Sequence, residues 1–202
     1  LAMSSMDDKK AFDDLGLGYT ETFGNPELRY EISKTYDTAK PENILCFVGA
    51  EEGIYVAMRV LLNRNDHAIV VVPNYQSAET IPLDICEVSG VPLNPEKNWA
   101  LDIDRIKNEI RPNTKLVSIN FPNNPTGAIL ARDRYDELVK ICRQTGLYLF
   151  SDEVYRLIER DIRLRLPQVG DIYERGLSLN VMSKAYGMPG LRIGWIMCKD
   201  KD

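Results

Sequence analysis

The sequence predicts an α/β domain: a three-layer sandwich in which helices cover both faces of a mainly parallel sheet. Short apolar runs along the chain are nearly continuous rather than alternating, which is typical of strands buried on both faces. Segments with the apolar period of a helix separate these runs. Each motif whose polar side chains could bind or react directly follows an apolar run. Ligands of parallel sheets bind beyond the carboxyl ends of the strands.

The apolar runs predict strands over residues 44–48, 68–72, 116–121, 147–150 and 177–182. Apolar residues at helical spacing predict three helices, one through Ile54, Ala57, Met58 and Leu61, one through Ile103, Ile106 and Ile110, and one through Tyr135, Leu138, Val139 and Cys142. Asp102 is a suitable N-cap for the second helix, and Gly146 is a suitable stop for the third.

Two parts are expected along the chain: an N-terminal segment over residues 1–43 and a main domain over residues 44–202. In the first part, Gly16, Gly18, Gly24 and Pro26 punctuate two modest helical stretches with no strand between them. The alternation of strands and helices begins only near Ile44.

Composition predicts a soluble globular protein. The 202 residues are 44% hydrophobic and 27% charged, and the formal net charge of −5 disfavours nucleic-acid and anionic-membrane partners. No apolar run approaches the ~18 residues of a membrane span. The first residues lack the layout of a signal peptide, and because the sequence begins with Leu1, the natural start is expected upstream.

The cysteines and the single histidine are given no catalytic role. Cys46, Cys86, Cys142 and Cys198 are widely spaced, which predicts buried free thiols in a reducing cytoplasm and neither a zinc site nor disulfides. His67 follows Asp66 at the entry to an apolar run, and a surface turn is expected there.

The stretch from Ser183 to Trp195 suggests a cofactor. Lys184 follows an apolar run, and Arg192 lies eight positions later among glycines. Such a pair alone is usually solvated surface. However, an amine that condenses with an aldehyde and a guanidinium that binds phosphate are what pyridoxal phosphate requires. The amine must be available in its neutral form, which burial and nearby cations favour.

Pyridoxal phosphate also needs a helix N-terminus for its phosphate, a carboxylate for its ring nitrogen and donors for its phenolic oxygen. Ala50 and Glu51 lie in a small-residue turn between a predicted strand and helix, where a plain turn is the alternative interpretation. Tyr75 could stack on the pyridine ring or simply pack.

Two further motifs follow strands. Asn124 belongs to a Pro/Asn/Gly turn and could bind the phenolic oxygen, although such residues also suit an ordinary turn. Asp152 could pair with the ring nitrogen and Tyr155 could donate to the phenolic oxygen. The alternative is that Asp152 and Glu153 form an acidic pair facing water at the end of a strand.

Together these segments resemble the class I/II aminotransferases, which are fold-type I pyridoxal-phosphate enzymes. The resemblance rests on residues 19–29, 124–127, 152–155 and 183–194, which match family motifs in order, and it extends over nearly the whole chain. It implies that residues 44–202 are the cofactor-binding large domain of that fold. It also implies that residues 1–43 belong to the small domain and dimer interface.

The resemblance implies a role for each candidate residue. Lys184 is the expected Schiff-base lysine, Asp152 the partner of the ring nitrogen, and Asn124 and Tyr155 the ligands of the phenolic oxygen. The catalytic residues are expected to be Lys184, Asp152 and Tyr155. Arg192 and the backbone of Ala50 and Glu51 are the expected phosphate ligands, and Tyr75 the stacking aromatic. Tyr19 is expected to reach the cofactor of a partner subunit, which implies a homodimer. No metal is expected.

The sequence departs from the family pattern in two respects. Many members carry Ser or Thr three residues before the lysine, where this chain has Val181, and Ser183 is expected to compensate. Family subunits also continue into a C-terminal domain whose arginine binds the substrate carboxylate. This chain stops at Asp202, so we expect a partial chain or a truncated protein.

The function implied is transfer of an amino group between an amino acid and a 2-oxo acid, within amino acid metabolism. A pyridoxal-phosphate lyase that carries out β-elimination is the first alternative, because these motifs serve the cofactor and not the bond that breaks. An effector-sensing regulatory module is a second alternative, although no basic helix-turn-helix pattern precedes Tyr19. A non-catalytic remnant is a third.

Overall fold

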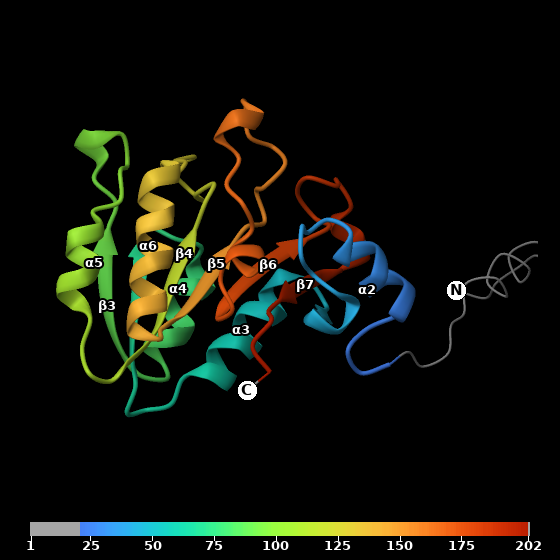
Figure 1. Cartoon of the computed structure of the whole chain (residues 1–202), viewed down its shortest axis with the longest axis horizontal. Coiled ribbons are helices and arrows are strands. Elements are labelled where there is room, and N and C mark those ends of the chain that lie inside the picture. The colour runs from blue at the N-terminus through green and yellow to red at the C-terminus, as the bar shows by residue number, and fades with distance from the viewer. Residues whose placement is uncertain (1–20, 202) are drawn as a thin grey trace, which may run out of the picture.

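One seven-stranded sheet organises the structure, a computed structural model that describes residues 21–201 (Figure 1). The strands are β1 (Ile44–Phe47), β2 (His67–Val72), β3 (Glu87–Pro92), β4 (Thr114–Asn120), β5 (Tyr148–Asp152), β6 (Gly176–Val181) and β7 (Gly194–Met197). They lie in the order β1-β7-β6-β5-β4-β2-β3. Only β7 pairs antiparallel with its neighbours, so every other strand of this sheet ends at the same edge.

Helices cover both faces of the sheet. They are α2 (Pro26–Ser33), α3 (Ala50–Leu61), α4 (Gln76–Leu83), α5 (Ile103–Glu109), α6 (Arg132–Thr145) and α7 (Val169–Ile172). Side chains of α5, α6 and α7 form a core with Val117 and Leu149 of the strands. The neighbouring residues of the same strands, including Leu116 and Phe150, form a second core with α3 and α4. Because neighbouring strand residues point to opposite faces, this alternation confirms the predicted three-layer sandwich.

All five predicted strands are present, with ends that differ by at most two residues. The sequence analysis missed β3, β7, α4 and the four-residue helix α7. Strand β3 lies at the edge of the sheet and contains polar and glycine residues, so it lacks a continuous apolar run. Strand β7 has only four residues. Helix α4 contains Pro82, which weakens its helical pattern.

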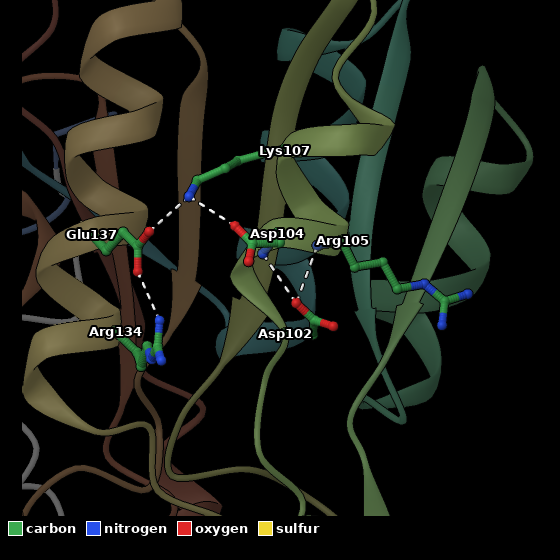
Figure 2. A network of polar contacts seen from close by, with 6 residues as sticks. All are labelled: Asp102, Asp104, Arg105, Lys107, Arg134 and Glu137. Atoms are coloured by element: carbon green, nitrogen blue, oxygen red, sulfur yellow. Dashed lines mark hydrogen bonds and ion pairs between the residues drawn. The ribbon is translucent and has the colours of Figure 1, made fainter.

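The predicted helix ends are confirmed at two positions. Asp102 caps α5, because its Oδ1 accepts from the backbone N–H groups of Asp104 (3.0 Å) and Arg105 (3.2 Å) (Figure 2). Gly146 follows the last residue of α6 in the left-handed region, with φ 72°. Glycine has no Cβ and adopts this conformation without strain.

Helices α5 and α6 are also linked at the surface. The Lys107 ammonium group donates to Asp104 (3.0 Å) and to Glu137 of α6 (2.7 Å), and Arg134 donates to Glu137 (3.1 Å) (Figure 2). Exposed ion pairs typically contribute no more than about 1 kcal/mol. The packing of α5 therefore depends mainly on its buried isoleucines, Ile103 and Ile106.

The N-terminal segment packs on the end of the sheet that carries β1 and β7, where Figure 1 shows α2. Asn25 caps α2 by accepting from the N–H groups of Glu27 (2.9 Å) and Leu28 (3.1 Å). The phenol oxygen of buried Tyr36 accepts from Trp195 Nε1 at 3.0 Å, which ties the segment to β7. Helix α2 agrees with the second predicted helical stretch, and the first lies outside the described residues.

Residues 21–201 include no helix with both the length and the apolar content needed to cross a membrane. All four cysteines are free thiols, as predicted, but only Cys142 is fully buried.

The predicted surface turn at His67 is wrong. His67 is the first residue of β2 and its exposed fraction is 0%. The ring is buried because both nitrogens have partners: Nδ1 lies 2.8 Å from Thr114 Oγ1, and Nε2 lies 3.0 Å from Ser89 Oγ. Burial lowers the pKa of His67 below its ordinary value of 6.5, and the charge of Arg111 acts in the same direction.

This burial predicts a pH-dependent stability. The unfolded chain binds a proton at His67 near pH 6.5, whereas the folded protein does so only at lower pH, so the free energy of unfolding falls as pH drops below about 6.5. The contribution cannot exceed about 1.4 kcal/mol per pH unit for one group. Chemical unfolding of wild type and His67→Gln between pH 7.5 and 5 should show the steeper fall in wild type. Parallel curves would contradict the prediction, since all carboxylates are common to both proteins.

Candidate active site

A pocket of about 250 Å³ brings together residues that follow several different strands. It contains nine of the predicted site residues, namely Ala50, Glu51, Tyr75, Asn124, Asp152, Tyr155, Ser183, Lys184 and Arg192. Tyr19 lies outside the described residues. The pocket is also lined by residues that the sequence analysis did not select, namely Ile54, Asn120, Val154, Val181 and Pro189.

Asp152 is a buried carboxylate at the end of β5. Its exposed fraction is 3%, and its Oδ1 accepts from the backbone N–H of Val154 at 3.1 Å. Burial raises the pKa of Asp152 to about 7, although the positive charge of Lys184 and the Val154 hydrogen bond act in the opposite direction. A cationic group bound beside Asp152 would favour its ionised form.

Lys184 and Tyr155 face each other across the pocket. The Lys184 ammonium nitrogen lies 5.3 Å from the centre of the Tyr155 ring, which is within the range of a cation–π contact. Lys184 follows β6 and begins a turn in which its carbonyl accepts from the N–H of Gly187 at 3.0 Å. In this structure the Lys184 side chain is exposed, and Ser183 before it is half-buried.

Arg192 lies against the N-terminus of α3. Its Nη1 donates to the Pro189 carbonyl at 3.0 Å, and a Cβ atom added to Gly49 would lie only 2.5 Å from Nη2. Gly49 is the N-cap residue of α3, with φ 90° and no side-chain cap. The guanidinium and the first-turn N–H groups of α3 therefore form a cationic cradle, which suits an anion such as phosphate.

Asn120 connects the ends of three segments and was missed by the sequence analysis. It is paired with Asp152 in the β4–β5 register. Its Nδ2 donates to the Asp152 carbonyl at 3.0 Å, and its Oδ1 accepts from the Asn124 backbone N–H at 2.7 Å. Its place at the end of a predicted strand was the available signal.

The first turns of α3 and α4 meet at Glu51. Ser77 Oγ donates to Glu51 Oε2 at 3.0 Å. The negative charge of Glu51 raises the pKa of Tyr75 above its ordinary value. Tyr75, the N-cap residue of α4, is 44% exposed and presents an aromatic ring to the pocket.

Asp152 and Glu153 do not form an acidic pair facing water, which was the alternative interpretation. Both are buried, with exposed fractions of 3% and 4%. Asp152 lines this pocket, whereas Glu153 lines a different cavity and accepts from the N–H of Val169.

The fold and the site define a mixed α/β domain of the fold-type I architecture. The chain belongs to the family of class I and II aminotransferases, whose model matches residues 8–201.

The chain is similar to individual aminotransferases in sequence and in structure. The chain is 31% identical to an aspartate aminotransferase of Pyrococcus horikoshii over 195 residues, which is 94% of this chain and 50% of that protein. It is 30% identical to the arginine–pyruvate transaminase AruH of Pseudomonas aeruginosa, covering 93% of this chain and 50% of that protein. A crystal structure of a PLP-dependent aminotransferase from Streptococcus suis matches with a TM-score of 0.87 and 33% identity, over 96% of this chain and 52% of that one. The chain thus spans about half the length of the curated relatives it matches.

The backbone φ of 90° at Gly49 predicts that replacing this glycine destabilises the fold, and the Arg192 guanidinium would also have to move. Gly49→Ala introduces a Cβ at φ 90° and against the guanidinium, so it should lower the free energy of unfolding by roughly 1–3 kcal/mol. Gly190→Ala is the matched control, because a Cβ there has nothing within 4 Å. Its effect should stay within about 0.5 kcal/mol. Equal losses in the two variants, measured by chemical unfolding, would contradict this account.

Proposed function

We propose that this chain is the cofactor-binding part of a pyridoxal-phosphate-dependent aminotransferase that moves an amino group between an amino acid and a 2-oxo acid. The observation that carries the proposal is the meeting of Lys184, Asp152 and Arg192 in one pocket. Membership of the aminotransferase family supports it. The proposed division at residue 44, with the large domain after it, follows the resemblance in sequence.

The residues present fit pyridoxal phosphate. The cradle formed by Arg192 and the N-terminus of α3, which a Cβ at Gly49 would fill, suits its phosphate. Lys184 would bind its aldehyde carbon, and Tyr75 would stack on its ring. Asn124 and Tyr155 would bind its phenolic oxygen, and the backbone of Ala50 and Glu51 its phosphate. When bound, this cofactor supplies an electron sink for the negative charge that develops at the substrate α-carbon.

Asp152 has the properties needed to hold a proton on a ring nitrogen. Burial raises its pKa to about 7, which means that the carboxylate gains from a cationic partner. A ring N–H⁺ next to Asp152 lowers that pKa again and is itself stabilised. Asp152 would therefore keep the ring nitrogen protonated.

Lys184 is the proposed acid–base group. Its amine would take the proton from the substrate α-carbon and deliver it to the neighbouring carbon on the cofactor side. The Tyr155 ring, 5.3 Å away, limits where the amine can lie. Ser183 would add a phosphate contact in place of the residue at Val181.

We also propose a homodimer of the cytoplasm that acts in amino acid metabolism. The dimer rests on the resemblance of Tyr19 to the family tyrosine that reaches the partner's cofactor. The cytoplasmic location rests on four free cysteines.

The role of Lys184 can be tested in the full-length protein loaded with pyridoxal phosphate. Lys184→Ala should lose the visible absorption band of the lysine-bound cofactor and lower turnover at least about a hundredfold, because the proton-transfer group is removed. Lys140→Ala, an exposed lysine of α6, should leave both unchanged. Retention of the band or of turnover in Lys184→Ala would refute the assigned role.

The products identify the reaction class. Formation of a 2-oxo acid without free ammonia, with stoichiometric amination of an added 2-oxo acid, is the expected result. Release of pyruvate together with ammonia would instead identify β-elimination by the same pocket. Coupled assays for ammonia and for 2-oxo acids on a panel of amino donors measure both.

A further inference from the structure

Glu153 faces a small cavity on the other side of the sheet from the active-site pocket. Ser151 of β5 lines this cavity together with Glu153, whereas Asp152 between them lines the pocket, so the side chains alternate between the two faces. The cavity lies among Phe121, Tyr135, Glu153, Arg156 and Glu159. Glu153 is 4% exposed, so its carboxylate is fully enclosed by protein.

Half of the Glu153 carboxylate lacks a protein partner. Oε1 accepts from the Val169 N–H at 2.9 Å and from Ser178 Oγ at 3.3 Å. Oε2 is buried and makes no hydrogen bond of good geometry among residues 21–201, although the Ser151 hydroxyl on the same cavity wall lies close enough to lower the pKa of Glu153. The buried Nε of Arg156 likewise has no acceptor in the described part of the chain. The cavity wall thus carries one unmet acceptor and one unmet donor, and leaving such groups unmet costs free energy.

The two groups are near each other but not in contact. The positive charge of Arg156 lowers the pKa of Glu153, whereas burial, the larger effect, raises it to about 7. Both residues line the same cavity, which offers about 20 Å³ to the centre of a water molecule. A single water needs roughly 10–15 Å³ of such space and two to four polar partners. The cavity therefore has the size and the polarity for one water.

We propose that this cavity binds one buried water, which accepts from Arg156 Nε and donates to Glu153 Oε2. The bridge makes Glu153 and Arg156 positioning residues for the end of β5, which carries Asp152, and for the turn after it, which carries Tyr155. The water site is independent of the reaction. Its effect on the pocket rests on the proposed function.

The turn after β5 is the element that such a bridge would hold. The backbone N–H of Arg156 donates to the Glu153 carbonyl at 2.8 Å, which closes this turn. Tyr155 lies within the turn, between Glu153 and Arg156. Leu157 has φ 80°, a strained value for a residue with a side chain. Glu159, whose side chain is 2% exposed, accepts from the Leu157 N–H at 3.1 Å and from Arg165 Nε at 3.0 Å.

The bridge would therefore continue the polar contacts of this turn back to the sheet. Beyond the turn, the segment up to α7 projects from the sheet (orange in Figure 1). Without a link between Arg156 and Glu153, the side chain of Arg156 would be held to the strand by packing alone. Tyr155, one residue earlier, would then have more freedom over the pocket.

Crystallography of the full-length protein loaded with pyridoxal phosphate tests the water directly. At a resolution of about 1.5 Å, we expect one ordered water within hydrogen-bond distance of both Glu153 Oε2 and Arg156 Nε. A dry cavity, or a direct ion pair between the two side chains, would overturn the proposal. This readout requires no turnover, so it stands if the proposed transamination fails.

A matched pair of variants tests the positioning role. Arg156→Gln keeps an amide at the place of Nε, whereas Arg156→Met puts a methyl group there, and both remove the charge. Arg156→Met should weaken cofactor binding by about three- to tenfold, as expected for the loss of one buried hydrogen bond. Arg156→Gln should weaken it less than twofold. Titration of the visible band measures both dissociation constants.

Two results would overturn the positioning role: equal losses in both Arg156 variants, or no loss in either. Glu153→Gln should also weaken binding, and Glu96→Gln, an exposed carboxylate that lines neither cavity, should not. If Arg156→Met does not fold, the Glu153→Gln and Glu96→Gln pair decides in the same way. Wild-type protein that binds the cofactor without transferring an amino group would contradict the proposed function and leave this comparison intact.

Discussion

The pocket depends on parallel strands that end in register at one edge of the sheet. Asn120 of β4 is paired with Asp152 of β5, and Asp152 is paired with Leu179 of β6. Because neighbouring strands lie about 4.8 Å apart, residues distant in sequence meet without long loops. The antiparallel strand β7 completes the arrangement. It begins at this same edge, where Gly194 packs so closely that a Cβ would lie 2.6 Å from the Gly49 carbonyl carbon.

The end of β5 carries two buried carboxylates that are compensated differently. Burial raises the pKa of Asp152 and of Glu153 to about 7. Asp152 faces a pocket that can admit a cationic ligand, so its charge can be matched by what binds. Glu153 faces the small cavity on the other face of the sheet, and it accepts from the Val169 N–H and the Ser178 hydroxyl. In the proposed function, this strand end would serve a binding role on one face of the sheet and a structural role on the other.

Much of the fold followed from local pattern, because strands buried on both faces read as continuous apolar runs. Strand β3 escaped because an edge strand need not be apolar. The site was accessible from sequence where a residue type at a strand end carries chemistry, as at Lys184 and Asp152. The burial of His67 was not accessible, because it depends on partners from distant segments. Asn120 offered the signal of its place at the end of a predicted strand, but its contact with Asp152 depends on the pairing of β4 with β5. His67 is buried only because Ser89 and Thr114 take up its two ring nitrogens.

Relatives of this chain are named for different amino donors. Proteins named for aspartate and for arginine–pyruvate transfer resemble it almost equally, at 31% and 30% identity. This resemblance therefore does not single out one amino donor. In the proposed function, Lys184, Asp152 and Arg192 bind cofactor groups that are the same for every substrate. Asp152 ends β5, Lys184 lies in the turn after β6, and Arg192 lies against the N-terminus of α3, so the fold of the sheet places all three around one pocket.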